Sequence, residues 1–163
     1  NTEYVELVNI GDEAVNLKLV RFTRGIDFAF PSVELAPGHH VLVVKDVAAF
    51  EGKYGRGLPI AGQYNGSLDN AGERIELRDA TGKVIHSFRY RDGWHDSTDG
   101  MGFSLTIEDP VTADPNDYGS KELWRPSHSP GGSPGFSDAG VAEVPLEENR
   151  QPHTPVNRMQ TEG

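Results

Sequence analysis

Residues 70–90 read NAGERIELRDATGKVIHSFRY and contain two alternating segments on either side of a short polar turn. In the first segment, Ile75 and Leu77 alternate with charged residues, so they lie on one side of an extended chain. The second segment, residues 83–90, alternates in the same way. Two such segments joined by the turn sequence DATG predict a β-hairpin.

Asn70-Ala71-Gly72 comes directly before this hairpin, and Asn and Gly both tolerate a positive φ. We therefore interpret the tripeptide as the corner at which the chain enters the hairpin, not as an active site. Glu73 is interpreted as a solvated edge charge or as an acceptor of backbone hydrogen bonds.

Other parts of the chain also contain short apolar or alternating segments that are bounded by turn residues. The predicted strands outside the hairpin are residues 4–8, 17–23, 27–31, 40–45, 102–109 and the block that begins at Trp124. Seven or eight short strands with regularly spaced turns are typical of an antiparallel β-sandwich. The predicted fold class is therefore all-β.

Residues 46–55, DVAAFEGKYG, interrupt this pattern and predict one short helix. Asp46 can cap its N-terminus, and Gly55 suits the position after its last turn. Phe50 and Tyr54 are spaced so that they share one helix face.

The composition limits the classes of function. The 163 residues include no Cys, which excludes a disulfide scaffold, a thiolate zinc site and a cysteine nucleophile. The net charge is −10 and no run of Lys and Arg occurs, which argues against a nucleic-acid partner because such partners require a basic surface. The nearest approach to one is FRYRDG, residues 88–93, where Arg89 and Arg91 are interpreted as a solvated strand face.

The two ends of the sequence differ in character. Residues 1–9 already look like a strand and contain neither a signal peptide nor a membrane-spanning segment, so we expect a piece of a longer protein. No membrane insertion is expected. Residues 137–163 are polar and have no periodicity, which predicts a disordered tail or interdomain linker after a domain of residues 1–136.

Five blocks of the sequence, taken in order, resemble the lamin-tail domain. They are EYVELVNIGDEAVNLKLVRF, LAPGHHVLVVKDVAAFEGKYG, GSLDNAGERIELRDATGKVIHSFRYRD, GMGFSLTIEDP and WRPSHSPGGSPG. The resemblance covers about residues 3–136 and implies an immunoglobulin-like β-sandwich. The long closing block is similar to that of the bacterial branch, whose members occur in secreted and surface proteins.

The resemblance implies no catalytic residues and an extracellular or cell-surface location. Two hypotheses follow. The first is a non-catalytic binding or adaptor module of a larger secreted or cell-surface bacterial protein, with a protein or cell-surface partner. The alternative is a substrate-targeting accessory domain of an extracellular hydrolase, such as a nuclease or phosphatase. The oligomeric state is left open.

Metal binding has one candidate. DPNDYG, residues 114–119, has some oxygen ligands at the spacing of a calcium loop but lacks its final glutamate, so it fails as an EF-hand. The low-ranked calcium candidates are Asp109, Asp114, Asn116 and Asp117, and the favoured alternative is an ordinary acidic loop. No other cofactor is expected.

Two residues in the loop after the hairpin are candidates for contact with a partner. Trp94 lies beside His95 in a polar segment, and an exposed tryptophan in a loop can anchor an interface. Burial of Trp94 against the end of the sandwich is the preferred alternative. Trp124 is expected in the core.

Overall fold

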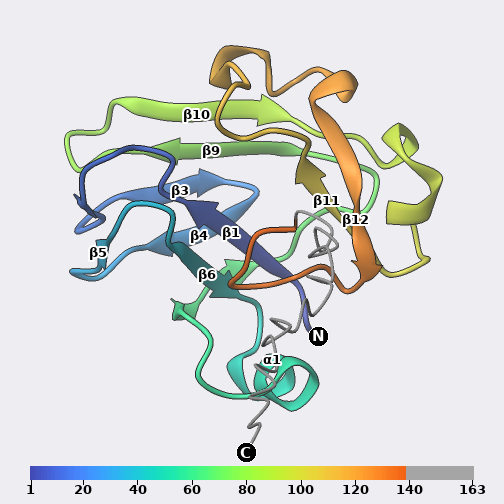
Figure 1. The fold of residues 1–163 in the computed structure, drawn as a ribbon, viewed down its shortest axis with the longest axis horizontal. Coiled ribbons are helices and arrows are strands. Elements are labelled where there is room, and N and C mark those ends of the chain that lie inside the picture. The colour runs from blue at the N-terminus through green and yellow to red at the C-terminus, as the bar shows by residue number, and fades with distance from the viewer. Residues whose placement is uncertain (139–163) are drawn as a thin grey trace, which may run out of the picture.

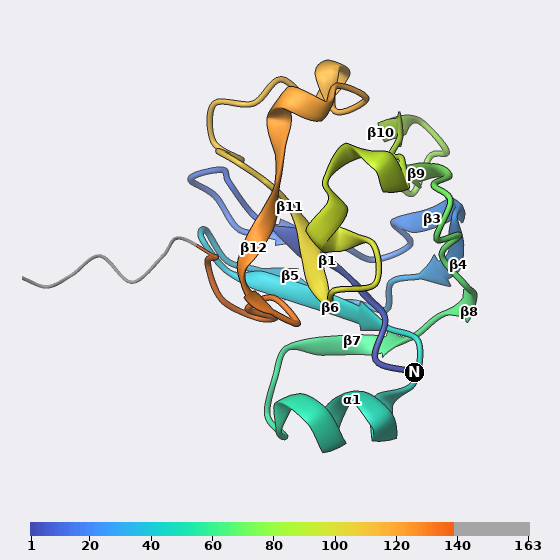
Figure 2. The same cartoon turned by 90° about the vertical axis from the view of Figure 1, so that its right-hand side faces the viewer.

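The computed structural model describes residues 1–138, in which a five-stranded sheet and a three-stranded sheet face each other (Figures 1 and 2). The five-stranded sheet has the strand order β10-β9-β3-β4-β8, and the three-stranded sheet has the order β1-β6-β7. The strands are β1 (Tyr4–Val8), β2 (Val15–Asn16), β3 (Arg21–Arg24), β4 (Ile26–Ala29), β5 (Glu34–Leu35), β6 (His40–Val44), β7 (Ile60–Gln63), β8 (Asn65–Gly66), β9 (Arg74–Arg78), β10 (Val84–Arg89), β11 (Phe103–Ile107) and β12 (Trp124–Pro130). This is an immunoglobulin-like β-sandwich, as predicted.

The predicted hairpin is confirmed as β9 and β10, which pair antiparallel. Asp79 organises the turn between them. Its carboxylate accepts hydrogen bonds from the backbone N–H groups of Thr81 and Lys83, each at 2.9 Å. Gly82 completes the turn with a φ of +89°.

The predicted corner at residues 70–72 is also confirmed. Gly72 has a φ of +94°, and a Cβ at this position would collide with the carbonyl oxygen of Tyr90. The side chain of Glu73 accepts a hydrogen bond of 2.8 Å from the backbone N–H of Asp69. These residues therefore shape the scaffold.

Strand β6 is buried on both faces, which explains its continuous apolar sequence. Val41 and Val43 pack into the core between the two sheets. Leu42 and Val44 face the other way and pack against Phe50 of α1 (Val47–Tyr54). The side chain of Asp46 caps this helix by accepting from the N–H of Ala49 at 2.9 Å, so the predicted helix and its cap are confirmed.

One pair of strands departs from the predicted antiparallel arrangement. Strand β7 lies parallel to β6, with Leu42 opposite Ile60. Parallel neighbours need a crossover connection, and α1 supplies it. The sequence predicts no strand at β7, because Ile60–Gln63 contains Gly62 and shows no alternation.

Strands β11 and β12 form a separate two-stranded sheet at one end of the sandwich. A group of aromatic rings joins this sheet to β10. Trp124 packs against Phe88 with ring centroids 5.3 Å apart, and its indole N–H donates to the carbonyl oxygen of Tyr118 at 2.8 Å. Two short 3₁₀ segments, η1 (Asp92–Trp94) and η2 (Asp96–Thr98), lie in the loop between β10 and β11, and two more, η3 (Pro115–Asp117) and η4 (Lys121–Leu123), lie between β11 and β12.

The chain after β12 is tied back to the sandwich as far as Asp138. The carboxylate of Asp138 accepts from Arg125 at 2.6 Å and from the hydroxyl of Ser133 at 2.8 Å. The backbone N–H of Gly135 donates to Glu6 on β1 at 2.6 Å. The anchored region therefore extends two residues past the predicted boundary at residue 136, while the rest of the predicted tail, residues 139–163, lies outside the described residues.

Candidate binding surface

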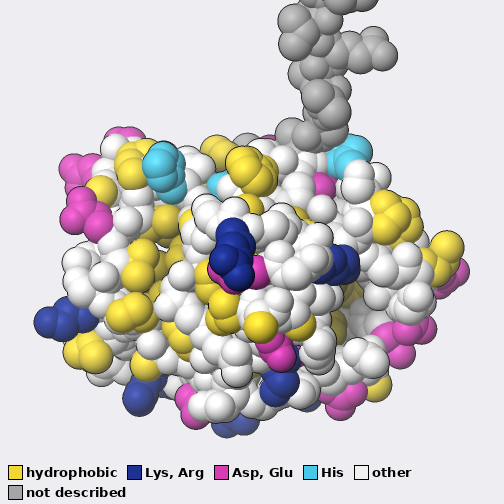
Figure 3. All heavy atoms as spheres, turned by 90° about the horizontal axis from the view of Figure 1, so that it is seen from below, with side chains coloured by type: hydrophobic (Ala, Val, Ile, Leu, Met, Phe, Trp, Pro, Cys, Tyr) yellow, Lys and Arg dark blue, Asp and Glu magenta, His cyan; other side chains and the backbone are white. Residues whose placement is uncertain are grey.

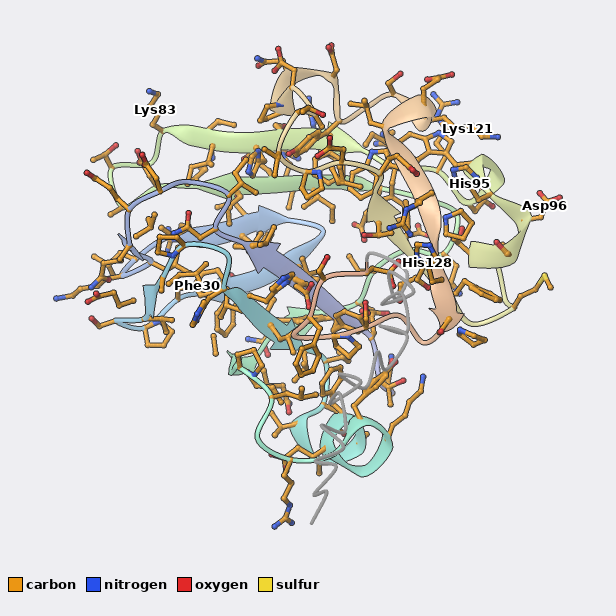
Figure 4. The ribbon with its side chains drawn as sticks, viewed as in Figure 1. Phe30, Lys83, His95, Asp96, Lys121 and His128 are labelled. Atoms are coloured by element: carbon orange, nitrogen blue, oxygen red, sulfur yellow. The ribbon has the colours of Figure 1, made fainter. Side chains whose placement is uncertain are left out.

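The structure buries Trp94, which confirms the preferred interpretation and excludes this residue as an exposed partner contact. Its side chain is buried, at 8% exposure, and its ring centroid lies 6.2 Å from that of Trp124. His95 is half-buried, and its Nε2 lies 2.8 Å from the carbonyl oxygen of Trp124. His95 and Asp96 lie at the opposite end of β10 from Lys83 (Figure 4). A partner contact by His95 stays a prediction.

The four calcium candidates serve their own loops. Asp109 accepts from the backbone N–H of Val111 at 3.0 Å and from the hydroxyl of Thr112 at 2.6 Å. Asp114 accepts from the backbone N–H of Asn116 at 2.9 Å and caps η3, which ends at Asp117. Within residues 1–138 no three His, Asp or Glu side chains are grouped so that they could hold a metal ion. The calcium prediction therefore gains no geometric support.

The outer face of the five-stranded sheet carries several arginine side chains. We call this surface the arginine face, and it consists of Arg21 and Arg24 on β3, Arg74 and Arg78 on β9, and Arg89 on β10. The apolar residues of β9 and β3, including Leu77 and Phe22, point inward and are buried, so the arginines that alternate with them point outward. A register shift after Phe22 brings Arg24 opposite Glu76 on the same face. Figure 2 shows this sheet at one side of the molecule, and no described element lies beyond it.

The strand register places arginines directly opposite one another at two positions. Arg74 pairs with Arg89 on β10, and Arg78 pairs with Arg21 on β3. Like charges in such cross-strand pairs are destabilising. The side chains of Arg21, Arg74 and Arg89 have no hydrogen bond or ion pair with another residue of the described chain, although Glu73 and Asp79 line the same hollows.

Glu76 lies between the two arginine pairs and is the centre of the arginine face. It alternates outward with Arg74 and Arg78 as predicted, yet only 7% of it is exposed. Its Oε1 accepts from Nε of Arg78 at 2.8 Å and from the hydroxyl of Thr23 at 2.7 Å, and its Oε2 lies 4.0 Å from Nε of Arg24. The hydrogen bonds from Arg78 and Thr23 hold the pKa of Glu76 below its usual range. Glu76 is therefore ionised at neutral pH and fixes the position of Arg78.

Two shallow hollows lie on this side of the molecule, one toward each end of β9. The first, of about 390 Å³, is lined by Thr23, Arg24, Gly25, Glu73, Arg74 and Arg89. The second, of about 360 Å³, is lined by Leu19, Arg21, Ala29 and the turn residues 79–82. Each hollow thus contains one member or both members of an opposed arginine pair.

Leu19 in the second hollow has an unusual backbone. Its φ of +65° is the only positive φ at a non-glycine position within residues 1–138. Its side chain is 57% exposed, so burial does not compensate this strained conformation. Leu19 therefore adds an exposed apolar group beside Arg21.

The side of the molecule around α1 has a different charge pattern. Basic and acidic side chains are scattered among one another there (Figure 3). Arg56, just after the helix, illustrates this pattern, since its guanidinium lies 3.6 Å from the carboxylate of Glu51.

Comparison with known proteins is consistent with this architecture. The profile of the Lamin Tail Domain family matches residues 1–92, which is more than half of the chain. The chain belongs to the lamin tail domain family. No curated protein and no solved structure matches this lamin tail domain. The matched region ends just after β10 and includes every strand of the two facing sheets.

The lamin tail domain family is a non-catalytic, immunoglobulin-like one. Within residues 1–138 no helix is long and apolar enough to cross a bilayer.

Proposed function

We propose that this lamin tail domain is a non-catalytic binding module of a larger secreted or cell-surface bacterial protein. We further propose that it contacts an anionic partner through the arginine face. The observation that carries the proposal is the presence of two opposed arginine pairs, Arg74 with Arg89 and Arg21 with Arg78, on the uncovered side of a sheet.

Charge complementarity supports an anionic partner. Five arginines share this face with Glu76, the exposed Asp27 of β4, and Glu73 and Asp79 in the two hollows, which leaves a small local excess of +1 on a chain whose net charge is −10. Because Arg21, Arg74 and Arg89 have no partner in the described chain, an anion can bind them without breaking an existing ion pair. Planar guanidinium groups bind carboxylates and phosphates with two parallel hydrogen bonds.

A binding experiment with charge-matched variants tests the proposal. Arg74→Gln with Arg89→Gln removes two charges from the arginine face, and Arg56→Gln with Lys121→Gln removes two exposed charges elsewhere. We expect the first variant to bind immobilised polyglutamate or oligothymidylate about tenfold more weakly than the wild type at low salt, since each exposed ion pair contributes up to about 1 kcal/mol. The second variant should bind like the wild type. Equal binding by the two variants would contradict the proposed surface.

A second candidate function is a substrate-targeting accessory domain of an extracellular nuclease or phosphatase. The arginine face favours it as well, because the substrates of such enzymes carry phosphate groups. Preferential binding to oligothymidylate over polyglutamate supports this function, and the reverse preference supports a protein partner. Turnover of an ester or phosphate ester by the chain, abolished by a single substitution, would refute the non-catalytic assignment.

A further inference from the structure

We propose that His86 makes the contact between the sandwich and the β11–β12 sheet sensitive to pH, so that this contact opens when the imidazole is protonated while the two facing sheets stay folded. The proposal depends neither on the arginine face nor on the identity of a partner. It follows from the place of His86 in a cluster of rings that joins two parts of the molecule. We call this cluster the aromatic joint, and it consists of His86, Phe88, Trp94, Tyr118 and Trp124.

The aromatic joint connects β10 to the segments that follow it. His86 and Phe88 belong to β10, and their ring centroids lie 5.4 Å and 5.8 Å from that of Tyr118, which comes just after η3. The ring of Tyr118 in turn lies 6.0 Å from that of Trp124, the first residue of β12. Tyr118 is therefore the ring through which His86 acts on the β11–β12 sheet.

The environment of His86 suits the neutral imidazole. His86 is half-buried, and its Nδ1 is buried without a hydrogen-bond partner in residues 1–138. A neutral imidazole can leave one nitrogen without a proton, whereas an imidazolium carries an N–H on both. An imidazolium is attracted to the face of a tyrosine ring, but a buried N–H that has no acceptor costs more. Burial accordingly lowers the pKa of His86 below its ordinary value of 6.5.

The neighbouring elements do not supply a charge that would stabilise the imidazolium. On β9, the apolar Leu77 lies opposite His86. The segment η3 packs against β10 and is flanked by Asp114 and ends at Asp117. The charge of Asp114 adds to burial in raising the pKa of Tyr118, but within residues 1–138 neither aspartate has a hydrogen bond or ion pair with His86.

Two further basic side chains lie near the joint. Arg89 is three residues from His86 on β10, so its side chain points to the opposite face of the strand. The Nε2 atom of His95 lies 2.8 Å from the carbonyl oxygen of Trp124. A carbonyl oxygen only accepts, so Nε2 donates in both the neutral and the protonated imidazole, and protonation of His95 leaves this bond in place.

The folded state therefore favours neutral His86, which fixes the sign of the pH dependence. The stabilisation is complete above the ordinary pKa of 6.5 and decreases as the pH falls below that value toward the lowered pKa. The other end of the β11–β12 sheet is held by uncharged hydrogen bonds, because the hydroxyl groups of Tyr4 and Tyr54 donate to the carbonyl oxygen of Gly131 at 3.2 Å and 2.9 Å. The aromatic joint therefore opens while this end stays attached.

Tryptophan fluorescence provides a local test, because both tryptophans of the chain belong to the aromatic joint. The emission maximum and acrylamide quenching are measured between about pH 8 and pH 5, and amide hydrogen exchange in β6 reports on the sandwich. We expect a red shift and stronger quenching at the acidic end of this range, with β6 still protected. Unchanged fluorescence, or loss of protection in β6 together with the red shift, would overturn the proposal.

Two variants assign the transition to one histidine. His86→Phe keeps a ring in the joint but cannot be protonated, so its fluorescence should stay constant over this range. His95→Gln retains a side-chain donor for the carbonyl oxygen of Trp124 and should behave like the wild type. Both variants keep every carboxylate, including Glu6, so differences between the profiles come from the substituted histidine. A transition that persists in His86→Phe, or disappears in His95→Gln, belongs to another group and contradicts the role of His86.

An NMR titration of the wild type makes the test independent of how well the variants fold. The imidazole resonances of His86 should titrate with a midpoint below 6.5, and the red shift should occur over the same pH range. A midpoint at or above 6.5, or a red shift at a different pH, would overturn the proposal.

Discussion

At the scale of single residues, two glycines show how backbone conformation and the space for a side chain restrict a position independently of each other. Gly72 and Gly82 both have a φ near +90°, but only Gly72 is crowded, because a Cβ there would collide with the carbonyl oxygen of Tyr90. At Gly82 nothing lies within 4 Å of the position that a Cβ would take. An alanine at either position would therefore adopt a strained left-handed conformation. Only at position 72 would its Cβ also collide with a neighbouring atom.

We expect Gly82→Ala to lower the free energy of unfolding by about 1–2 kcal/mol, the cost of a left-handed conformation for an L-residue. Gly72→Ala should cost clearly more, because the backbone of Tyr90 must also move. Urea denaturation of both variants gives the two values. Equal losses of unfolding free energy in the two variants would show that the backbone around residue 72 moves aside at no cost.

At the scale of elements, the helix α1 joins β6 to its parallel neighbour β7, so its stability bears on the edge of the three-stranded sheet. Asp46→Ala removes the hydrogen bond to the N–H of Ala49 and should cost about 1 kcal/mol. Asp46→Asn retains an oxygen acceptor and should stay close to the wild type. Urea denaturation measures both, and a similar loss in Asp46→Asn would indicate that charge, not capping, is the main contribution.

At the scale of the whole molecule, the segment after β12 connects the last strand to the first. Glu6 on β1 accepts from Gly135, and Asp138 accepts from Arg125, Ser133 and His128. Burial by itself raises the pKa of Asp138, but the hydrogen bonds from these three residues outweigh it and lower the pKa below the ordinary value of 3.8. The folded state therefore favours the ionised carboxylate.

This shift has a defined sign in acid. A carboxylate whose pKa is lower in the folded state stabilises the protein fully above about pH 4, and the stabilisation is lost as the pH falls through the lowered pKa. We expect Asp138→Asn to be less stable than the wild type at pH 5 and to lose less stability between about pH 4 and pH 2. Urea unfolding across this range measures both effects. Identical slopes in the two proteins would refute the contribution of Asp138.

Glu6 acts in the opposite direction and must be considered in the same titration. Burial raises its pKa above the ordinary value of 4.5, although hydrogen bonds from Gly135 and His40 partly oppose the shift. Glu6 therefore favours folding in its protonated form, and its contribution falls as the pH rises through the raised pKa. The charge of Asp138 is one of the causes that raise the pKa of Glu6, so Asp138→Asn also moves the pKa of Glu6 toward its ordinary value. The comparison is therefore made in a Glu6→Gln background, where this second titration is absent.

Features that depend on neighbouring residues could be predicted from the amino-acid sequence. Alternation at Ile75 and Leu77 indicates the inward face of β9, the turn residues indicate the hairpin, and Asp46 indicates the start of the helix. These signals are local because side-chain direction, turn geometry and capping each involve only a few consecutive residues. They also predict that Arg74 and Arg78 point outward.

Contacts between residues that are distant in sequence emerge only in the folded molecule. The register that places Arg21 opposite Arg78, and Thr23 beside Glu76, joins strands separated by about fifty residues, so no local pattern encodes it. The same holds for the burial of Trp94 by Trp124 and for the parallel pairing of β7. The arginine face exists because strand pairing gathers dispersed charges onto one surface, which is why an acidic chain without a basic run still carries a local basic patch.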